Sequence, residues 1–335
     1  MLVLLIVMGL WFSRVHAWTT MSLSYEGFLG HSGDHVKLHR TWLEQKGCES
    51  TFYLSENIRD MRLGDKSAIT VAGRRRRWSI DLEKKVVGVT GWIDAHEKPV
   101  VTDDGRRILT FMSSFPPVLK DGDHHVVMED SCPIFVYASG KTGRVLTGLC
   151  SERIHLWTGK QSEGGVVVPL VEGSGAPLCG SLCGDYAFVG CMDGTVAILD
   201  VSTRDWVVHS GYVTGRASPV RCLDVVSLGV AGYSILTGHH DGSIRTYSWS
   251  PPSHTLTLHS VFCDLFHSPV TCISGSPLRM ATADENGRVV VSNRLGVVMW
   301  SFKFPARGTP VLLQMTDRYL IVAGDKTVRI WDHLP

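Results

Sequence analysis

Asparagine, sustained apolar runs and excess charge of either sign are all scarce in this chain of 335 residues. None of its three asparagines, Asn57, Asn286 and Asn293, heads an Asn-x-Ser/Thr acceptor site, so N-glycosylation is excluded. The apolar run over residues 1–12 is too short to span a membrane. A formal net charge of +1 gives no general attraction to nucleic acid or to an acidic membrane. These absences favour a protein that works by specific contacts.

Catalytic and ligand-binding motifs are also absent. The chain has no Gly-x-Ser-x-Gly elbow and no His-Glu-x-x-His pair. The "SGKTG" stretch over residues 139–143 ends like a phosphate loop, but Phe135 stands where the upstream glycine belongs, so a hairpin turn is predicted. Cys179 and Cys183 have three residues between them and no second pair, which argues against zinc. The histidine clusters (His31, His35 and His39; His239 and His240) lack further ligands, so we expect no enzyme, no metal and no cofactor.

The cysteines indicate a reducing compartment. Nine is an odd number, and Cys222 and Cys272 occupy matching positions in two similar strands, as expected of reduced structural thiols. We therefore predict a cytoplasmic or nuclear location. The alternative is the secretory pathway, because residues 1–17 join a short apolar core to the small residues Val15 and Ala17, as in a cleaved signal peptide.

A proline followed by an apolar residue recurs along the chain. The six copies are "EKPVV", "SCPIFV", "GAPLC", "SPVRC", "SPVTC" and "GTPVLL", with their prolines at Pro99, Pro133, Pro177, Pro219, Pro269 and Pro310. Proline is tolerated at the first residue of a strand, where no ladder hydrogen bond is lost. Each copy therefore predicts the start of an equivalent strand.

A hairpin signal follows most of these prolines. Asp193-Gly194, Asp241-Gly242 and Asn286-Gly287 each separate two strand-like runs, a pattern typical of two-residue hairpin turns. The third strands are expected to end near Ile80, Trp157, Leu199, Tyr247, Ser292 and Trp331, and "RRILTFMSS" supplies one more unit after Pro99. Seven units of about forty residues, each read as four strands, are the pattern of a β-propeller.

The third-strand endings "RIHLW" (Arg153–Trp157) and "VRIWD" (Val328–Asp332) resemble those of the WD40-repeat family. The family's Gly-His pair is mostly missing, so its buried polar tetrad is not carried over whole. Thr147, Thr237 and Thr282 match its hydroxyl position, and Trp157 and Trp331 its aromatic one. The predicted fold class is all-β: a seven-bladed WD40-like β-propeller over residues 50–335, following an N-terminal extension over residues 1–49.

The N-terminal extension supplies two further expectations. The last unit stops without a fourth strand, so Ser50–Asn57 is expected to pair there and close the ring, as the resemblance implies. Residues 34–46 predict a short helix after the apolar segment 1–17, with Asp34 as its N-cap and Gly47 as its stop. A helix before a propeller resembles the F-box/WD-repeat subgroup, although no F-box is legible in residues 1–33.

The arginine-rich stretch "GRRRRW" (Gly73–Trp78) is the sharpest charged feature. Aligned with the last unit, Arg74 and Arg75 fall in the turn between second and third strands, and the resemblance implies that such turns open on the partner-binding face. Arginines there could bind acidic or phosphorylated peptide through forked donors, or could form a solvated turn. The predicted partner-binding residues are Arg74, Arg75, Arg76, Arg77, Trp92, Arg153, His239, His240 and Lys326.

The function that these features predict is a non-enzymatic platform for protein–protein interaction. The alternative role, on the F-box/WD resemblance, is substrate receptor of an SCF-type ubiquitin ligase, with ligase scaffold subunits among its partners. A propeller enzyme with carboxylates around the central mouth is the less favoured third hypothesis.

Overall fold

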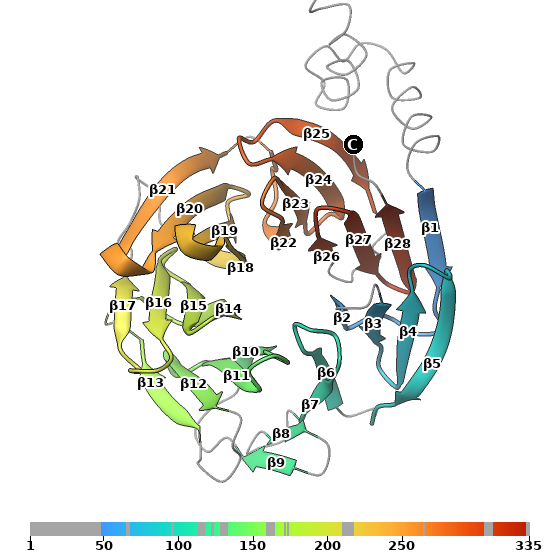
Figure 1. Ribbon diagram of the computed structural model, residues 1–335, viewed down its shortest axis with the longest axis horizontal. Coiled ribbons are helices and arrows are strands. Elements are labelled where there is room, and N and C mark those ends of the chain that lie inside the picture. Colours follow the sequence, from blue (N-terminus) through green and yellow to red (C-terminus); the bar gives the residue numbers. More distant parts are fainter. Residues whose placement is uncertain are drawn as a thin grey trace, which may run out of the picture.

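Seven four-stranded antiparallel sheets surround a common axis and form a ring (Figure 1). The computed structural model describes residues 48–64, 68–94, 97–112, 118–121, 124–127, 133–158, 165–170, 172, 174–209, 218–263, 265–304 and 311–332. In the six sheets built from consecutive strands, the first strand lies nearest the axis and the fourth lies at the rim. The predicted fold class, an all-β seven-bladed propeller, is confirmed.

The first four blades each consist of four consecutive strands. Blade 1 contains β2 (Asp60–Leu63), β3 (Ala68–Ala72), β4 (Arg76–Asp81) and β5 (Val86–Trp92). Blade 2 contains β6 (Glu97–Val101), β7 (Ile108–Met112), β8 (Val118–Asp121) and β9 (His124–Val127). Blade 3 contains β10 (Pro133–Ala138), β11 (Arg144–Leu149), β12 (Arg153–Thr158) and β13 (Val166–Pro169). Blade 4 contains β14 (Pro177–Cys183), β15 (Tyr186–Cys191), β16 (Val196–Asp200) and β17 (Trp206–His209).

The last three blades complete the ring. Blade 5 contains β18 (Val220–Ser227), β19 (Tyr233–His239), β20 (Ile244–Ser250) and β21 (Thr255–Phe262), with two 3-10 turns, η1 (Gly229–Ala231) and η2 (Pro251–Ser253). Blade 6 contains β22 (Val270–Gly275), β23 (Arg279–Asp284), β24 (Arg288–Asn293) and β25 (Val298–Lys303). Blade 7 contains β26 (Leu312–Met315), β27 (Tyr319–Gly324) and β28 (Thr327–Asp332), with β1 (Cys48–Tyr53) as its outer strand.

The start of the described chain lies beside its end. β1 pairs antiparallel with β28, from Cys48 opposite Asp332 to Tyr53 opposite Thr327. The sequence analysis expected the closing strand at residues 50–57, and the observed strand begins and ends a few residues earlier. This pairing covers an edge of β28 that would otherwise be open. The predicted helix at 34–46 and the apolar segment 1–17 lie outside the described residues.

The repeated prolines mark strand starts in four blades. β10 begins at Pro133 and β14 at Pro177, whereas Pro219 and Pro269 directly precede β18 and β22. The prediction for Pro99 is wrong, because it is the third residue of β6. β6 is an edge strand that pairs only with β7, so a residue without an N–H is tolerated inside it. Pro310 lies outside the described residues.

The predicted Asp-Gly and Asn-Gly hairpins are confirmed. Gly194, Gly242 and Gly287 adopt φ values of 91°, 84° and 78°, a region that favours glycine. Gly242 also lies against the loop that leads to the next blade: a Cβ there would lie 2.6 Å from the carbonyl oxygen of Phe266. This turn therefore requires glycine for its backbone conformation and for its contact with the neighbouring loop.

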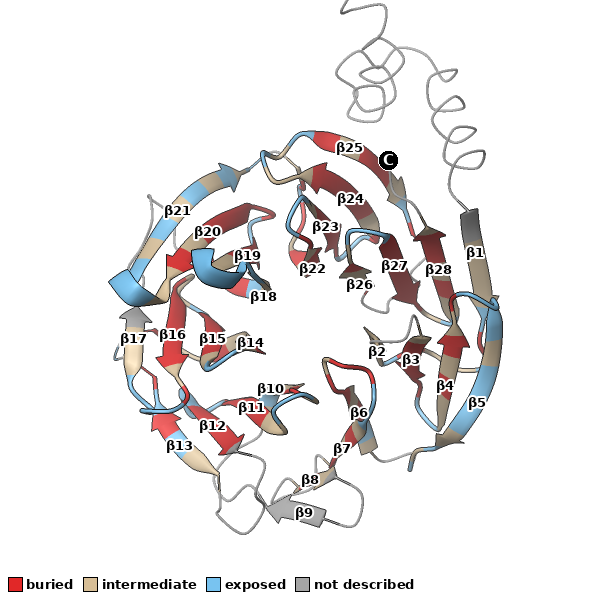
Figure 2. Ribbon diagram, viewed as in Figure 1, coloured by how far each residue is buried: buried red, intermediate tan, exposed pale blue. Residues whose placement is uncertain are grey.

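The apolar core lies between neighbouring blades. Middle strands are buried, whereas the rim strands β5 and β21 are largely exposed or half-buried and the rim strand β25 is mostly buried (Figure 2). Six apolar clusters join blade 1 to 7, 7 to 6, 6 to 5, 5 to 4, 4 to 3 and 3 to 2. Among the described residues, no such cluster joins blade 1 to blade 2. We call the contact between blades 1 and 2 the seam.

Cysteine thiols link inner strands of successive blades. The Cys179 thiol donates to the carbonyl oxygen of Val220 at 3.5 Å, and the Cys222 thiol to that of Val270 at 3.8 Å. Burial raises the pKa of the Cys222 thiol, and it raises the pKa of Cys272 to about 11. These thiols therefore stay protonated at neutral pH.

Candidate functional site at the ring mouth

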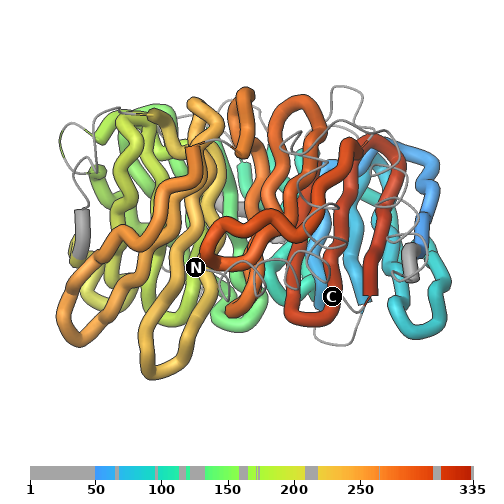
Figure 3. Tube along the Cα trace, turned by 90° about the horizontal axis from the view of Figure 1, so that it is seen from above, coloured from blue at the N-terminus to red at the C-terminus, as the bar shows by residue number. Residues whose placement is uncertain are grey.

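One face of the ring carries the turns between second and third strands together with the connections that precede each first strand. In an antiparallel four-stranded blade these segments lie at the same end of the strands, and Figure 3 shows the strands running between the two faces of the ring. We call this end the mouth face. It carries the arginine-rich turn at residues 73–75 and the matching turns of the other blades.

The arginine-rich turn is held by contacts to its backbone, which leaves its side chains exposed. The Gly73 N–H donates to the carbonyl oxygen of Arg76 at 2.9 Å, and the Arg75 N–H donates to Oε2 of Glu56 at 2.6 Å. A Cβ on Gly73 would lie 2.6 Å from the indole of Trp78, so this close approach requires glycine. The side chains of Arg74 and Arg75 therefore project from a fixed turn into solvent.

Arg76 and Arg77, the first two residues of β4, contact neighbouring protein groups. The Arg76 guanidinium lies 5.1 Å from the ring centroid of Trp92, which is 74% exposed, and donates to Oγ of Ser55 at 3.0 Å. The Arg77 guanidinium donates to the carbonyl oxygen of Arg106 at 3.3 Å. Arg76 thus holds the exposed indole of Trp92 beside the basic turn, where it can stack on a ligand.

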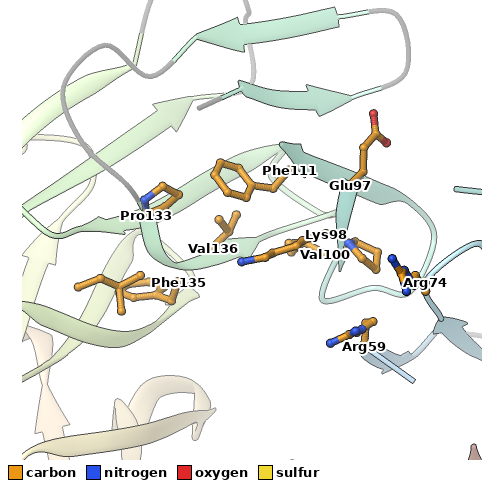
Figure 4. Close-up of a pocket in the computed structure, with 11 residues that line it drawn as sticks. Arg59, Arg74, Glu97, Lys98, Val100, Phe111, Pro133, Phe135 and Val136 are labelled. Carbon is orange, nitrogen blue, oxygen red and sulfur yellow. The ribbon is translucent and has the colours of Figure 1, made fainter. Parts of the chain in front are cut away.

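A pocket of about 600 Å³ opens beside this turn. Blades 1, 2 and 3 contribute to its lining, which consists of Arg59, Arg74, Glu97, Lys98, Pro99, Val100, Phe111, Pro133, Ile134, Phe135 and Val136. Figure 4 shows Arg59 and Arg74 at one end, the apolar residues of blade 3 at the other, and Lys98 between them. We call this cavity the mouth pocket; its volume lies within the range typical of ligand sites.

The charges of the mouth pocket favour an anion. Among the described lining residues the one acid is Glu97, which is neutralised by Lys120, whose Nζ lies 2.6 Å from Oε1. Within the part of the chain that the structure describes, the side chains of Arg59, Arg74 and Lys98 form no hydrogen bond or ion pair. The described lining therefore presents three cationic groups and one acid, and that acid is already paired.

The other predicted residues lie on different blades of the mouth face. Arg153 begins β12 of blade 3, His240 lies in the β19–β20 turn of blade 5, and Lys326 lies in the β27–β28 turn of blade 7. All three are exposed. None of the three is among the described residues that line the mouth pocket with Arg74. The segment at residues 54–58 contacts both the turn of Lys326 and the backbone of Arg75. The roles of the three residues in partner binding stay predictions.

His239 is predicted to bind a partner on the mouth face, but its side chain is fully buried and is not available for such a contact. It is the last residue of β19, a middle strand of blade 5 whose two faces pack against blades 4 and 6. Its Nδ1 lies 2.9 Å from the carbonyl oxygen of Ser218, and its Nε2 lies 2.9 Å from Oγ1 of Thr237. Burial, followed by the charge of Arg245, lowers the pKa of His239 to about 4. His239 is therefore a structural residue.

Sequence reasoning missed Arg59 and Lys98, which complete the positive lining. Lys98 immediately precedes Pro99, at a position where the other proline repeats carry the small residues Cys132, Ala176, Ser218, Ser268 and Thr309. That departure from the repeat was a usable signal. Arg59 has no comparable signal, because it lies in the segment that joins the closing strand to blade 1.

Polar residues also reach towards the axis below the mouth. The Arg62 guanidinium, from blade 1, lies 6.0 Å from the ring centroid of Tyr137 of blade 3. Burial raises the pKa of Tyr137 to about 12, and it raises that of Asp224 on blade 5. The Asp224 carboxylate accepts from the backbone N–H groups of Val225 and Gly275. This carboxylate is therefore committed to holding inner strands together.

The described residues contain neither a metal-ligand cluster nor a membrane-spanning helix. No group of three or more His, Cys, Asp or Glu side chains is placed to hold a metal ion among them. No helix within the described ranges has the length and apolar character needed to cross a bilayer.

Comparison with known proteins shows the fold alone. No family model matches the chain, and no curated protein matches it. Among solved structures, the chain is similar to the β-propeller domain of Cps50 (Swd1) from Myceliophteria thermophila, with a TM-score of 0.68 and 16% sequence identity. The match covers 84% of this chain and 98% of that one. The chain therefore has the architecture of a propeller, whereas the F-box/WD subgroup stays a prediction.

Proposed function

We propose that this protein is a non-enzymatic interaction platform that binds an acidic segment of a partner protein at the mouth pocket. The observation that carries the proposal is the juxtaposition of Arg59, Arg74 and Lys98 around one cavity, in which the one acid of the described lining is paired. Forked guanidinium donors bind carboxylate or phosphate groups with two hydrogen bonds each. The exposed Arg75 and Trp92 beside the cavity extend the surface that such a segment can contact.

Affinity capture from cells with the double variant Arg74→Glu, Arg75→Glu tests the proposal. We expect at least a tenfold loss of captured partner, because two attractive charges become repulsive at the rim of the pocket. The matched control is Lys84→Glu, Lys85→Glu, which reverses two adjacent exposed charges in the β4–β5 turn on the opposite face. Equal capture by parent and Arg74/Arg75 variant, at equal thermal midpoints, contradicts the proposal.

The role of substrate receptor in an SCF-type ubiquitin ligase is a finer hypothesis that rests on the F-box/WD resemblance. The segment that would carry an F-box, residues 1–33, lies outside the described residues. The same capture experiment decides this point. Recovery of ligase scaffold subunits favours the receptor role, and abundant capture of other proteins without these subunits contradicts it. We propose a cytoplasmic or nuclear location; an N-terminus beginning after Ala17 in the purified protein would instead indicate the secretory pathway.

A further inference from the structure

The seam between blades 1 and 2 differs from every other contact in the ring. Each other pair of neighbouring blades shares an apolar cluster, and the described residues of this pair share none. Hydrogen bonds hold the seam instead. The Val101 N–H donates to Oδ2 of Asp60 at 2.7 Å, and the Thr70 hydroxyl donates to the carbonyl oxygen of Gly105.

The mouth pocket lies over this seam and extends to blade 3. Arg59 and Arg74 belong to the blade 1 side, whereas Glu97, Lys98, Pro99 and Val100 belong to β6 of blade 2. Beyond the cations the lining is apolar: Pro99, Val100, Phe111, Pro133, Ile134, Phe135 and Val136. A simple anion would satisfy the cationic end and leave this apolar surface in contact with water.

We propose that the mouth pocket accepts an apolar side chain of the partner next to its acidic group, and that the bound segment bridges the seam, with its acid on the blade 1 side and its apolar group on blades 2 and 3. The inference rests on the proposed function and names its ligand class: a peptide segment with an aromatic or aliphatic residue adjacent to a carboxylate or phosphate. The acid pairs with Arg59, Arg74 and Lys98. The apolar group packs on the lining contributed by β6 and β10, so the occupant bridges three blades.

Bridging couples binding to the stability of the ring at this point. Local opening of a protein is favoured where no apolar cluster holds neighbouring elements together, and among the described residues the seam has no such cluster. A ligand that binds the closed seam and not the open one lowers the population of the open form. The amide of Val101, whose hydrogen bond crosses the seam, reports on this opening by hydrogen exchange.

Fluorescence polarisation with short synthetic peptides and the full chain tests the ligand class. Three peptides of equal length are compared: glutamate-rich with a central phenylalanine, glutamate-rich with serine in its place, and neutral with the phenylalanine retained. We expect the first to bind at least about tenfold more tightly than the second, because it also buries an apolar side chain. The neutral peptide is expected to bind most weakly.

Two variants separate the apolar lining from the fold. Ile134→Ser removes an apolar group of the pocket that is 39% exposed and is expected to reduce the tenfold preference to less than about threefold. Val167→Ser changes a residue of similar exposure, 41%, on the rim strand of the same blade, and is expected to keep the preference. Equal effects of the two variants overturn the assignment of the apolar subsite.

Hydrogen exchange gives an independent readout. The glutamate-rich peptide with phenylalanine is expected to slow hydrogen exchange at the amide of Val101. Exchange at the amide of Gly275, which donates to Asp224 between blades 5 and 6, is expected to stay unchanged. Equal affinity of the two acidic peptides, or no slowing at Val101, overturns this inference and leaves the proposed function standing. Binding of neither acidic peptide contradicts the proposed function and this inference with it.

Discussion

Buried His239 makes the propeller sensitive to acid, and the size of the effect follows from its surroundings. Its Nδ1–H donates to the carbonyl oxygen of Ser218, and its Nε2 accepts from the Thr237 hydroxyl. Protonation would place a cation in a fully buried site near Arg245, which opposes it, and Asp241, which favours it only partly. The folded protein therefore holds this imidazole neutral.

The sign and magnitude follow from the difference in pKa between folded and unfolded chains. The folded pKa is about 4 and the ordinary value is 6.5, so the unfolded chain binds more protons between these two values. Stability from this group is fully present above pH 6.5 and is lost as the pH falls towards 4. At 1.36 kcal/mol per pKa unit, the loss is about 3 kcal/mol.

The test is urea denaturation of parent and His239→Gln over this pH range. Glutamine does not titrate and keeps one donor and one acceptor, so His239→Gln is expected to lose about 3 kcal/mol less than the parent between pH 6.5 and 4. His240→Gln, which changes the exposed neighbouring residue, is expected to follow the parent. Identical pH dependence of the parent and His239→Gln would refute the reasoning.

Two further predictions concern the thiols and a turn. Alkylation of the folded protein at neutral pH should modify the exposed Cys150 and Cys263 first. It should spare Cys222 and Cys272, because burial raises the pKa values of their thiols. Mass spectrometry of the products checks this prediction, and early modification of Cys222 would contradict it. Gly242→Ala should lower the free energy of unfolding by about 2–4 kcal/mol, because alanine is strained at φ 84° and its Cβ would meet the carbonyl oxygen of Phe266. A loss under about 0.5 kcal/mol in urea denaturation would show that the turn relaxes freely.

The ring could be predicted because its signals repeat. Each Pro-apolar copy and each Asp-Gly or Asn-Gly turn supports the others, so an error at Pro99 does not disturb the assignment of blade 2. The exact residue at which an individual strand ends and its turn begins could not be predicted. His239 and His240 are both among the predicted partner-binding residues, but β19 continues through His239, and the middle strand of a blade buries both of its faces.

The mouth pocket could not be predicted as a unit. Its cations come from three different segments, before β2, after β3 and within β6, and only the ring brings them to one cavity. Arg74 was identified because four arginines in a row are conspicuous. Arg59 and Lys98 are isolated in the sequence, and the proximity that gives them a common role is a property of the closed fold.

Zero-length carbodiimide cross-linking of the captured complex tests the central claim most directly. This chemistry joins a lysine to a carboxylate only when the two are in contact, and Lys98 lines the mouth pocket. We predict that acidic residues of the partner are joined to Lys98. Cross-links only to Lys84, Lys85 or Lys141, which lie in turns on the opposite face, would contradict the assignment of the mouth pocket as the partner-binding site.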